Sequence, residues 1–349
     1  MQTQIFGQRV ELKKWLQFLL VSTALLLTGC GIIKTKSTVP VVLTPVTNAD
    51  KRALIAQINR YAEVKTIRGK VDVKFEDNSF AESGISEKYR AADGQVIVQS
   101  PSNINLRIQI PFVGTDLVQM TSDGEKFRVA VICCVDEKYK RFVTGTSTAD
   151  YTHLQEKARN IMQKGNAESK AISVFASLRP QHFTDALLMR PVQTGDEYVY
   201  TQSEIYQEED DQTKQKSRIA RVIRGYYLLD EYKKTSDNDL KIARRFWFDR
   251  IGGIRLARQQ VFDEKSVLRT DITYGAEQPF AEGGQYTLPG QVQITRPQER
   301  YSVKLTFQAP NAVVIGKTYA PKVFELENEW QLPEVDLDKQ TAQSTLLNR

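Results

Sequence analysis

Side chains that could do chemistry are few in this sequence of 349 residues. The two histidines, His153 and His182, do not stand at a metal-binding spacing such as H-E-x-x-H. The adjacent Cys133 and Cys134 have no histidine near them in the sequence that could serve as a base. The sequence contains no G-x-S-x-G nucleophile elbow, P-loop or dinucleotide fingerprint. We therefore predict a protein that is not an enzyme and that uses neither a metal nor a cofactor.

The adjacent cysteines allow two states. Neighbouring residues of a strand point to opposite faces, so Cys133 and Cys134 are expected as two buried or half-buried thiols. A disulfide between the two neighbours is the alternative in an oxidising compartment. In both cases the chain lacks a disulfide framework.

The third cysteine, Cys30, follows an N-terminal segment organised like a secretion signal. Arg9, Lys13 and Lys14 form a positive region, and an apolar run extends from Trp15 to Leu27. As a helix this run would span roughly 20 Å, which is short of the roughly 30 Å hydrocarbon core of a bilayer. We therefore expect a signal peptide rather than a permanent transmembrane helix.

The run from Leu25 to Cys30, LLLTGC, resembles the lipobox of bacterial lipoproteins. The resemblance implies a signal peptide at residues 1–29 and acyl chains on Cys30, enough for stable membrane anchoring. Gly31 stands where an aspartate retains enterobacterial lipoproteins at the inner membrane. The resemblance therefore implies a lipid-anchored protein of the cell outer membrane, facing the periplasm. An ordinary signal peptide followed by an incidental Cys30 is the alternative.

The charge of the chain is mild. The 48 Lys and Arg residues exceed the 42 Asp and Glu residues by six, and removal of the signal lowers the net charge to about +4. Basic and acidic residues are interleaved, whereas phosphate binding needs a concentrated basic face. We therefore predict no nucleic-acid partner. About 320 residues remain after the signal, enough for one large β domain or two modest ones.

The first part of the mature chain contains a tether and a helix. Residues 30–48 are rich in Thr, Val, Pro and Lys and have no helical period, which is typical of a flexible tether. Asn48 or Asp50 can then cap a helix that extends to about Val64. Its apolar residues recur at spacings of three and four, so one face of the helix should be buried.

Beyond this helix the hydrophobic pattern changes to period two. The cleanest alternation covers residues 103–110, where every second residue is a large aliphatic one, so we predict one dry and one wet face. Asp93-Gly94 and Asp123-Gly124 are hairpin signals. A later part of the chain predicts four successive strands, at 217–230, 241–250, 254–263 and 266–274.

Two segments depart from the strand pattern. A helical insertion is expected at about 150–188, with helices at 153–163, 169–178 and 181–188. The strongly polar residues 207–216 are expected to form an exposed loop tip. The C-terminal extension, residues 311–349, is polar from Leu332 onward, and we expect it to be partly disordered.

Together these elements predict a mainly β (α+β) fold in residues 49–310. About ten strands in a meander favour a strongly curved antiparallel sheet, an incomplete β-barrel with covering helices, because a large twisted sheet tends to curl or close. Such a sheet encloses either a filled core or an apolar cavity.

Three short motifs resemble the LolA/LolB-like family of lipoprotein carriers and receptors. They are the segment 94–110 with its Ser100-Pro101 break, the aromatic strand 246–250 followed by 254–259, and the Leu288-Pro289 turn. Arg258, Phe262 and Asp263 are similar to an R-x-x-x-Y/F-D strand in that family. The resemblance covers about residues 50–310. It implies a periplasmic lipoprotein that binds an acyl chain of a lipid or lipoprotein in outer-membrane trafficking.

An acyl chain would need an apolar lining. The residues that we predict to line the cavity all lie on apolar strand faces: Ile104, Leu106, Ile108, Ile110, Phe246 and Phe248. Each of them could instead be plain core. In that case the alternative function is a non-catalytic structural or accessory lipoprotein in envelope assembly, with a filled β core and a protein partner at an edge strand or at the acidic loop.

Overall fold

The computed structural model of the chain describes residues 39–77, 87–88, 92–110, 114–133, 137, 140–149, 151, 179–211 and 221–341. The predicted signal peptide, Cys30 and residues 31–38 of the predicted tether lie outside the described residues. The helices predicted at 153–163 and 169–178 lie outside them as well. None of the helices in the described ranges is long and apolar enough to cross a membrane.

The chain divides into two compact units. One unit comprises residues 1–42 and 208–223. Within it, β1 (Val41–Val42) pairs in parallel with the beginning of β10 (Arg221–Lys234), and Arg221 forms ion pairs with Glu208 at 3.2 Å and Asp210 at 3.6 Å. The other unit comprises residues 43–207 and 224–349 and contains the sheet, the helices and the cavities described below.

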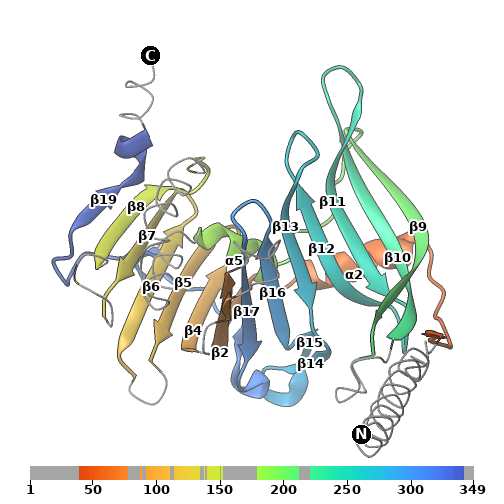
Figure 1. The fold of residues 1–349 in the computed structure, drawn as a ribbon, viewed down its shortest axis with the longest axis horizontal. Helices are drawn as coiled ribbons and strands as arrows, with labels where there is room; N and C mark the ends of the chain where they lie inside the picture. Colours follow the sequence, from red (N-terminus) through yellow and green to blue (C-terminus); the bar gives the residue numbers. More distant parts are fainter. Residues whose placement is uncertain are drawn as a thin grey trace, which may run out of the picture. The chain divides into compact units, whose positions relative to one another are not determined.

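The larger unit is built on one open, curved antiparallel sheet (Figure 1). Its two halves meet at β2 (Thr66–Asp77), which pairs with β17 (Tyr301–Phe307) on one side and with β4 (Ala92–Gln99) on the other. Beyond β17 the strands follow in the order β16 (Gln291–Arg296), β13 (Leu268–Tyr274), β12 (Arg255–Phe262), β11 (Leu240–Asp249) and β10. Beyond β4 they follow in the order β5 (Asn103–Gln109), β6 (Asp116–Asp123), β7 (Lys126–Val131) and β8 (Arg141–Thr146).

Several shorter strands complete this arrangement. The two-residue strands β3 (Glu87–Lys88) and β18 (Val314–Ile315) pair with β2, and β9 (Tyr198–Asp210) pairs with β10. β14 (Glu277–Phe280) and β15 (Tyr286–Pro289) form a separate hairpin. The prediction of a mainly β fold with a strongly curved antiparallel sheet and few helices is confirmed, and the sheet does not close into a barrel.

The alternating pattern places an apolar layer on the concave side of the sheet. Ile104, Leu106 and Ile108 of β5 are at most 1% exposed, and Leu106 lies opposite Val96 of β4 and Met120 of β6. Because side chains alternate across a strand, the same register turns the polar residues of these strands toward the outer face. These buried residues belong to one large hydrophobic cluster that extends through the unit.

The hairpin predicted at Asp93-Gly94 is wrong, because both residues lie inside β4. A Cβ on Gly94 would come within 2.9 Å of Val73 and 3.1 Å of Val71, so glycine is needed there for close packing and not for a turn. The signal at Asp123-Gly124 is confirmed. Gly124 has a φ of 95°, and the Asp123 carboxylate accepts hydrogen bonds from the two amides that follow the turn.

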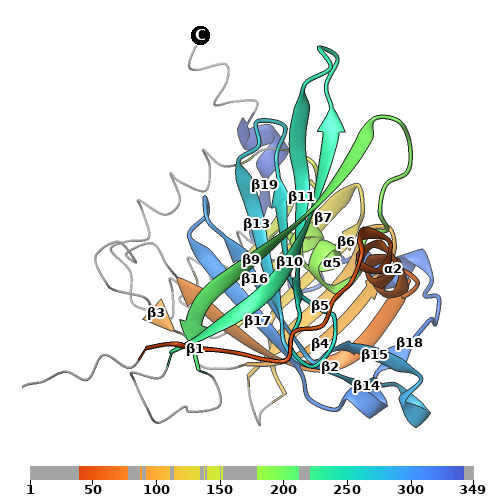
Figure 2. The ribbon, with the colours of Figure 1, turned by 90° about the vertical axis from the view of Figure 1, so that its right-hand side faces the viewer.

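Two α-helices lie near the site, α2 (Lys51–Ala62) and α5 (Pro180–Leu187). The Asp50 carboxylate caps α2 by accepting from the Ala53 amide at 2.9 Å, as the sequence predicts. The short α5 begins at a proline, which is favourable in the first turn. It contacts β16 as well as β4, β5 and β6, which are well separated in the sheet. Only the concave side of a curved sheet allows so short a helix to reach all of them (Figure 2).

The C-terminal segment covers part of the outer face of the sheet. It contains the short helices η5 (Pro310–Ala312) and η6 (Pro321–Phe324) and the strand β19 (Glu334–Asp336), which pairs in parallel with β8. The sequence predicts partial disorder in this extension, and the elements named here lie in its described part, up to residue 341. Order arises because irregularly spaced apolar residues form a second, smaller cluster on the outer face, made of Ala130, Phe142, Leu326 and Leu332 with Ile132 and Trp330 packed against it.

This covering also changes the predicted wet face of β5. Asn105 is only 8% exposed, and its amide donates to the Val323 carbonyl at 2.7 Å. Gln99 at the end of β4 exchanges two hydrogen bonds with the backbone of Tyr319. The outer face therefore combines exposed positions, such as Arg107, with positions that the C-terminal segment buries.

Candidate functional site

The predicted lining residues lie in the packed core of the larger unit. Ile104, Leu106 and Ile108 are on β5, one of the strands that α5 contacts, whereas Phe246 and Phe248 are on β11 and are 0% exposed. Ile110 lies just beyond the end of β5 and is half-buried. None of the six residues lines the apolar pocket described next, so their role as a lining stays a prediction.

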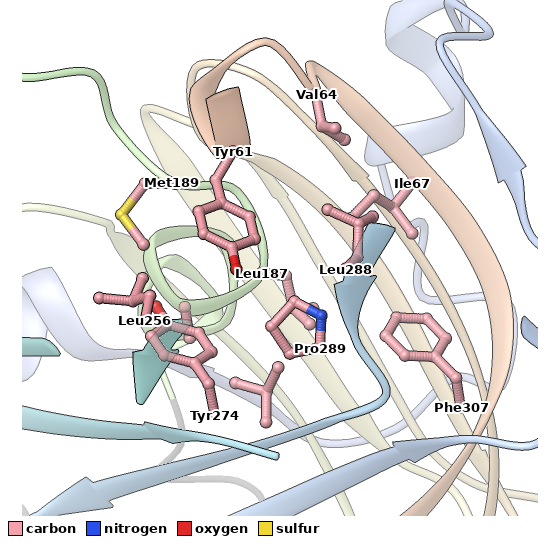
Figure 3. A pocket seen from close by; sticks show the side chains of 12 residues that line it. Tyr61, Val64, Ile67, Leu187, Met189, Leu256, Tyr274, Leu288, Pro289 and Phe307 are labelled. Atoms are coloured by element: carbon pink, nitrogen blue, oxygen red, sulfur yellow. The ribbon is translucent and has the colours of Figure 1, made fainter. Parts of the chain in front are cut away.

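An apolar pocket lies where the end of α2, the end of α5 and several strands meet (Figure 3). Its volume of about 30 Å³ has room for a water molecule but not for a lipid, since ligand pockets usually measure about 300–1,000 Å³. The lining comes from segments that are far apart in the sequence: Tyr61, Val64, Ile67, Ala186, Leu187, Met189, Leu256, Tyr274, Leu288, Pro289, Val292 and Phe307.

A polar contact joins α2 to the β14–β15 hairpin at this pocket. The Tyr61 hydroxyl donates to the Glu277 carboxylate, and Arg60 forms an ion pair with Glu277 at 3.3 Å. Arg60 also donates to the Thr287 carbonyl at 3.1 Å. Burial, followed by the hydrogen bond to Glu277, raises the pKa of Tyr61, so its phenol stays a donor at physiological pH. Leu288 and Pro289 of the same hairpin line the pocket next to Tyr61 (Figure 3).

The segment that follows α5 is fixed by a buried ion pair. Arg244 of β11 pairs with Glu231 of β10 at 2.6 Å, and the two residues are 7% and 2% exposed. The same guanidinium donates to the carbonyls of Arg190 and Pro191 at 3.0 and 2.9 Å. No sequence motif predicted this anchor. The feature of the sequence that could have indicated the anchor is Arg244 itself, a charged residue on the same strand face as Phe246 and Phe248.

Two further contacts hold the same region. Asp185 of α5 forms an ion pair with Arg190 at 2.5 Å. The Val192 amide donates to the Asn59 side chain at 3.1 Å, which ties this segment to α2. The polar attachments of α5 thus lie toward its ends, whereas Phe183 and Ala186 pack into the apolar interior.

His182 is a structural residue on α5. It is 8% exposed, and its Nδ1 lies 3.4 Å from the Tyr301 hydroxyl. Burial, together with the nearby Arg296 and Arg179, holds the pKa of His182 well below its usual value of 6.5. In the described part of the chain, no group of three His, Cys, Asp or Glu residues could hold a metal ion.

This buried histidine predicts an acid-sensitive fold. In the unfolded chain His182 binds a proton near pH 6.5, but in the folded chain only at lower pH. Below pH 6.5 the unfolded state binds more protons, so stability falls by up to about 1.4 kcal/mol per pH unit until the folded-state pKa is passed. Urea unfolding between pH 7.5 and 5 should show this loss, and His182→Gln should reduce it. Equal slopes for both proteins would contradict the assignment.

The cysteine pair differs from the favoured expectation. Cys133 is disulfide-bonded, not a thiol. The other two cysteines of the chain, Cys30 and Cys134, lie outside the described residues. The error arose because alternation along a strand was applied to Cys133, which in fact lies just beyond the end of β7.

Three solved structures are similar to this chain at low sequence identity. A DUF1329 family protein from Desulfovibrio piger is 12% identical with a TM-score of 0.40, covering 78% of this chain and 95% of that one. A domain described as an outer membrane lipoprotein-sorting protein, from Vibrio parahaemolyticus, is 11% identical with a TM-score of 0.37, covering 78% and 95%. A LolA superfamily protein from Nitrosomonas europaea is 10% identical with a TM-score of 0.39, covering 80% and 99%.

These structural neighbours include the LolA superfamily, which is the family that the sequence motifs resemble. No protein-family model matches the chain, and no curated protein matches it.

Proposed function

We infer that this chain is a membrane-anchored periplasmic lipoprotein that binds an acyl chain of a lipid or lipoprotein without covalent chemistry. In this proposal acyl chains on Cys30 anchor it to the outer membrane, and the cargo moves in outer-membrane lipid or lipoprotein trafficking. The observation that supports it most is the position of α5. A short helix fills the concave side of an open sheet and ends at an apolar pocket.

The binding step in this proposal is an exchange of α5 for the acyl chain. The sheet keeps its own backbone hydrogen bonds when α5 leaves, because α5 contacts the sheet through side chains, including the hydrogen bond between His182 and Tyr301. A buried side chain of the size of Phe183 or Met189 stabilises by about 1.5–3 kcal/mol. An acyl chain with about fifteen methylenes gains about 12 kcal/mol at about 0.8 kcal/mol for each one. The gain can therefore exceed the cost of displacing a few such side chains.

The alternative is an accessory lipoprotein whose interior stays filled. The small pocket volume favours this reading, since about 30 Å³ is an order of magnitude below that of an ordinary ligand pocket. The two functions differ in whether α5 can leave the interior, and this difference can be measured.

Phe183→Leu tests the exchange directly. Phe183 is 2% exposed, and the smaller side chain should weaken the packing of α5 by about 1 kcal/mol. If α5 must leave before an acyl chain binds, this loss appears as an apparent affinity about fivefold tighter. Native mass spectrometry of the full chain, purified from a bacterial envelope and titrated with a fatty acid, should record the increase.

Phe127→Leu is the matched control. Phe127 is also 2% exposed, but it lies on β7 of the sheet and packs against Tyr151. The Phe127→Leu substitution should lower the free energy of unfolding by a similar amount without increasing acyl uptake. If neither the natural chain nor either variant takes up fatty acid, the interior is a permanent core and the accessory function is favoured.

A further inference from the structure

A second and larger cavity lies on the opposite face of the sheet from α5. It measures about 460 Å³, and its floor comes from β2, β4, β5 and β6 while its wall comes from the C-terminal segment. The floor residues alternate with the core residues of these strands, so they point away from the apolar interior. We call this cavity the outer groove; it is lined by Arg68, Gln95, Ile97, Asn105, Arg107, Gln119, Lys322, Val323, Glu325, Leu326, Glu327, Glu329 and Trp330.

The floor of the outer groove is rich in hydrogen-bond donors. Arg107 lies directly between Gln95 and Gln119 in the strand register, and Arg68 lies opposite Ile97. Within the described ranges neither guanidinium forms an ion pair or a side-chain hydrogen bond. Strand spacing separates the two arginine backbones by about 12 Å, so both long side chains can reach one bound group. Guanidinium groups and amides at such positions suit a phosphate.

Gln119 adds to the floor an amide that no described side chain engages. It is only 6% exposed, yet its amide has no side-chain hydrogen bond to any described residue. Two positions along the same strand face, the buried Thr121 Oγ1 also lacks a partner. The Gln119 amide is not one of the fully buried polar atoms without a partner, so it is open to the groove. A polar ligand in the groove would supply a partner for Gln119.

The wall is mainly acidic, with three glutamates and one lysine, Lys322. Glu325, Glu327 and Glu329 are exposed along the C-terminal segment, and none of them forms an ion pair within the described ranges. Trp330 contributes an aromatic side chain, whose face attracts cations. The groove thus presents unpaired cations on its floor, and three unpaired glutamates beside one lysine on its wall. A ligand that matches both must carry an anionic group and a cationic group a few bonds apart.

We propose that the outer groove binds a zwitterionic phosphate–ammonium group of the phosphoethanolamine type. The phosphate lies against Arg68, Arg107 and Gln119, and the ammonium lies against the three glutamates and Trp330. The volume of 460 Å³ is within the range of small-ligand sites. This site is separate from the proposed acyl-binding interior and does not depend on it.

Binding to soluble headgroups tests the proposal. The full chain in detergent is titrated by calorimetry with glycerophosphoethanolamine and with glycerophosphoglycerol, which keeps the phosphate but lacks the ammonium. We expect the first to bind at least about tenfold more tightly, since a charge-assisted contact contributes about a factor of ten. Equal binding of both would overturn the zwitterion assignment. If neither compound binds at millimolar concentration, the outer groove holds only water, and the proposed binding site is overturned.

Variants test the two halves of the groove separately. Arg68→Gln with Arg107→Gln should weaken binding of both headgroups by about tenfold or more. Glu325→Gln, Glu327→Gln and Glu329→Gln together should remove the preference for glycerophosphoethanolamine while phosphate binding remains. Lys74→Gln is the control, an exposed lysine on the same face of β2 outside the groove, and should change neither. Unchanged binding in the double arginine variant, with the fold intact by circular dichroism, would contradict the proposal.

The source of the headgroup is distinguished by competition. Vesicles of phosphatidylethanolamine and of phosphatidylglycerol are added to the protein with its bound soluble headgroup. If only the phosphatidylethanolamine vesicles displace the headgroup, the natural source is a membrane lipid. Retention of the soluble headgroup in the presence of both vesicles identifies a free headgroup compound instead.

Discussion

Leu106→Arg should prevent folding or cost several kcal/mol of unfolding free energy. Leu106 is 0% exposed on β5, between Val96 and Met120 on neighbouring strands. An arginine there would place a charge in the apolar layer on which α5 packs, opposite two apolar residues and no acidic partner. Chemical denaturation of the purified full chain measures the loss.

Leu106→Met is the control for this prediction. It conserves volume and polarity, so it should cost less than about 1.5 kcal/mol. A well-folded Leu106→Arg variant with nearly unchanged stability would mean that water reaches this side chain. The interior would then be an open cavity, and α5 would not seal it.

Arg244→Met should destabilise the protein by about 3–5 kcal/mol. The substitution leaves Glu231, at 2% exposure, as a buried charge without its ion-pair partner and, among the described residues, with only the Tyr200 hydroxyl as a side-chain donor. It also removes the donors to the carbonyls of Arg190 and Pro191, which follow α5. Thermal or urea unfolding measures the effect, and the α5 segment should become more accessible to protease.

Two further variants isolate the cause. Adding Glu231→Leu to Arg244→Met should recover much of the loss, because an apolar pair can replace a buried ion pair. Arg269→Met breaks the more exposed ion pair with Asp263, at 3.0 Å, and should cost at most about 1 kcal/mol. Equal costs for Arg269→Met and Arg244→Met would show that burial of the pair is not the source of the effect.

Local sequence signals predicted much of the architecture. The alternation in residues 103–110 fixed which face of β5 is buried, and Asp50 marked the beginning of α2. The helix predicted at 181–188 corresponds to α5, which begins one residue earlier at Pro180. These predictions succeeded because strand period and helix capping depend on neighbours in the chain.

Features that depend on distant contacts were not predicted. Gly94 carries a turn signal but serves close packing against Val71 and Val73, which are about twenty residues away. The outer cover formed by Leu326 and Leu332 has no regular period, so the sequence did not reveal it. The pocket beside Tyr61 is lined by residues from many parts of the chain, the last of them Phe307. No spacing rule in the sequence connects these residues.

The measurement that tests the exchange of α5 for an acyl chain most directly is hydrogen exchange of the full chain with and without a saturating fatty acid. We predict that the amides of residues 180–187 exchange faster when the acyl chain is bound, whereas those of β5 keep their protection because the sheet remains intact. Fatty acid that binds without changing the exchange of α5, or that slows it, would contradict the account.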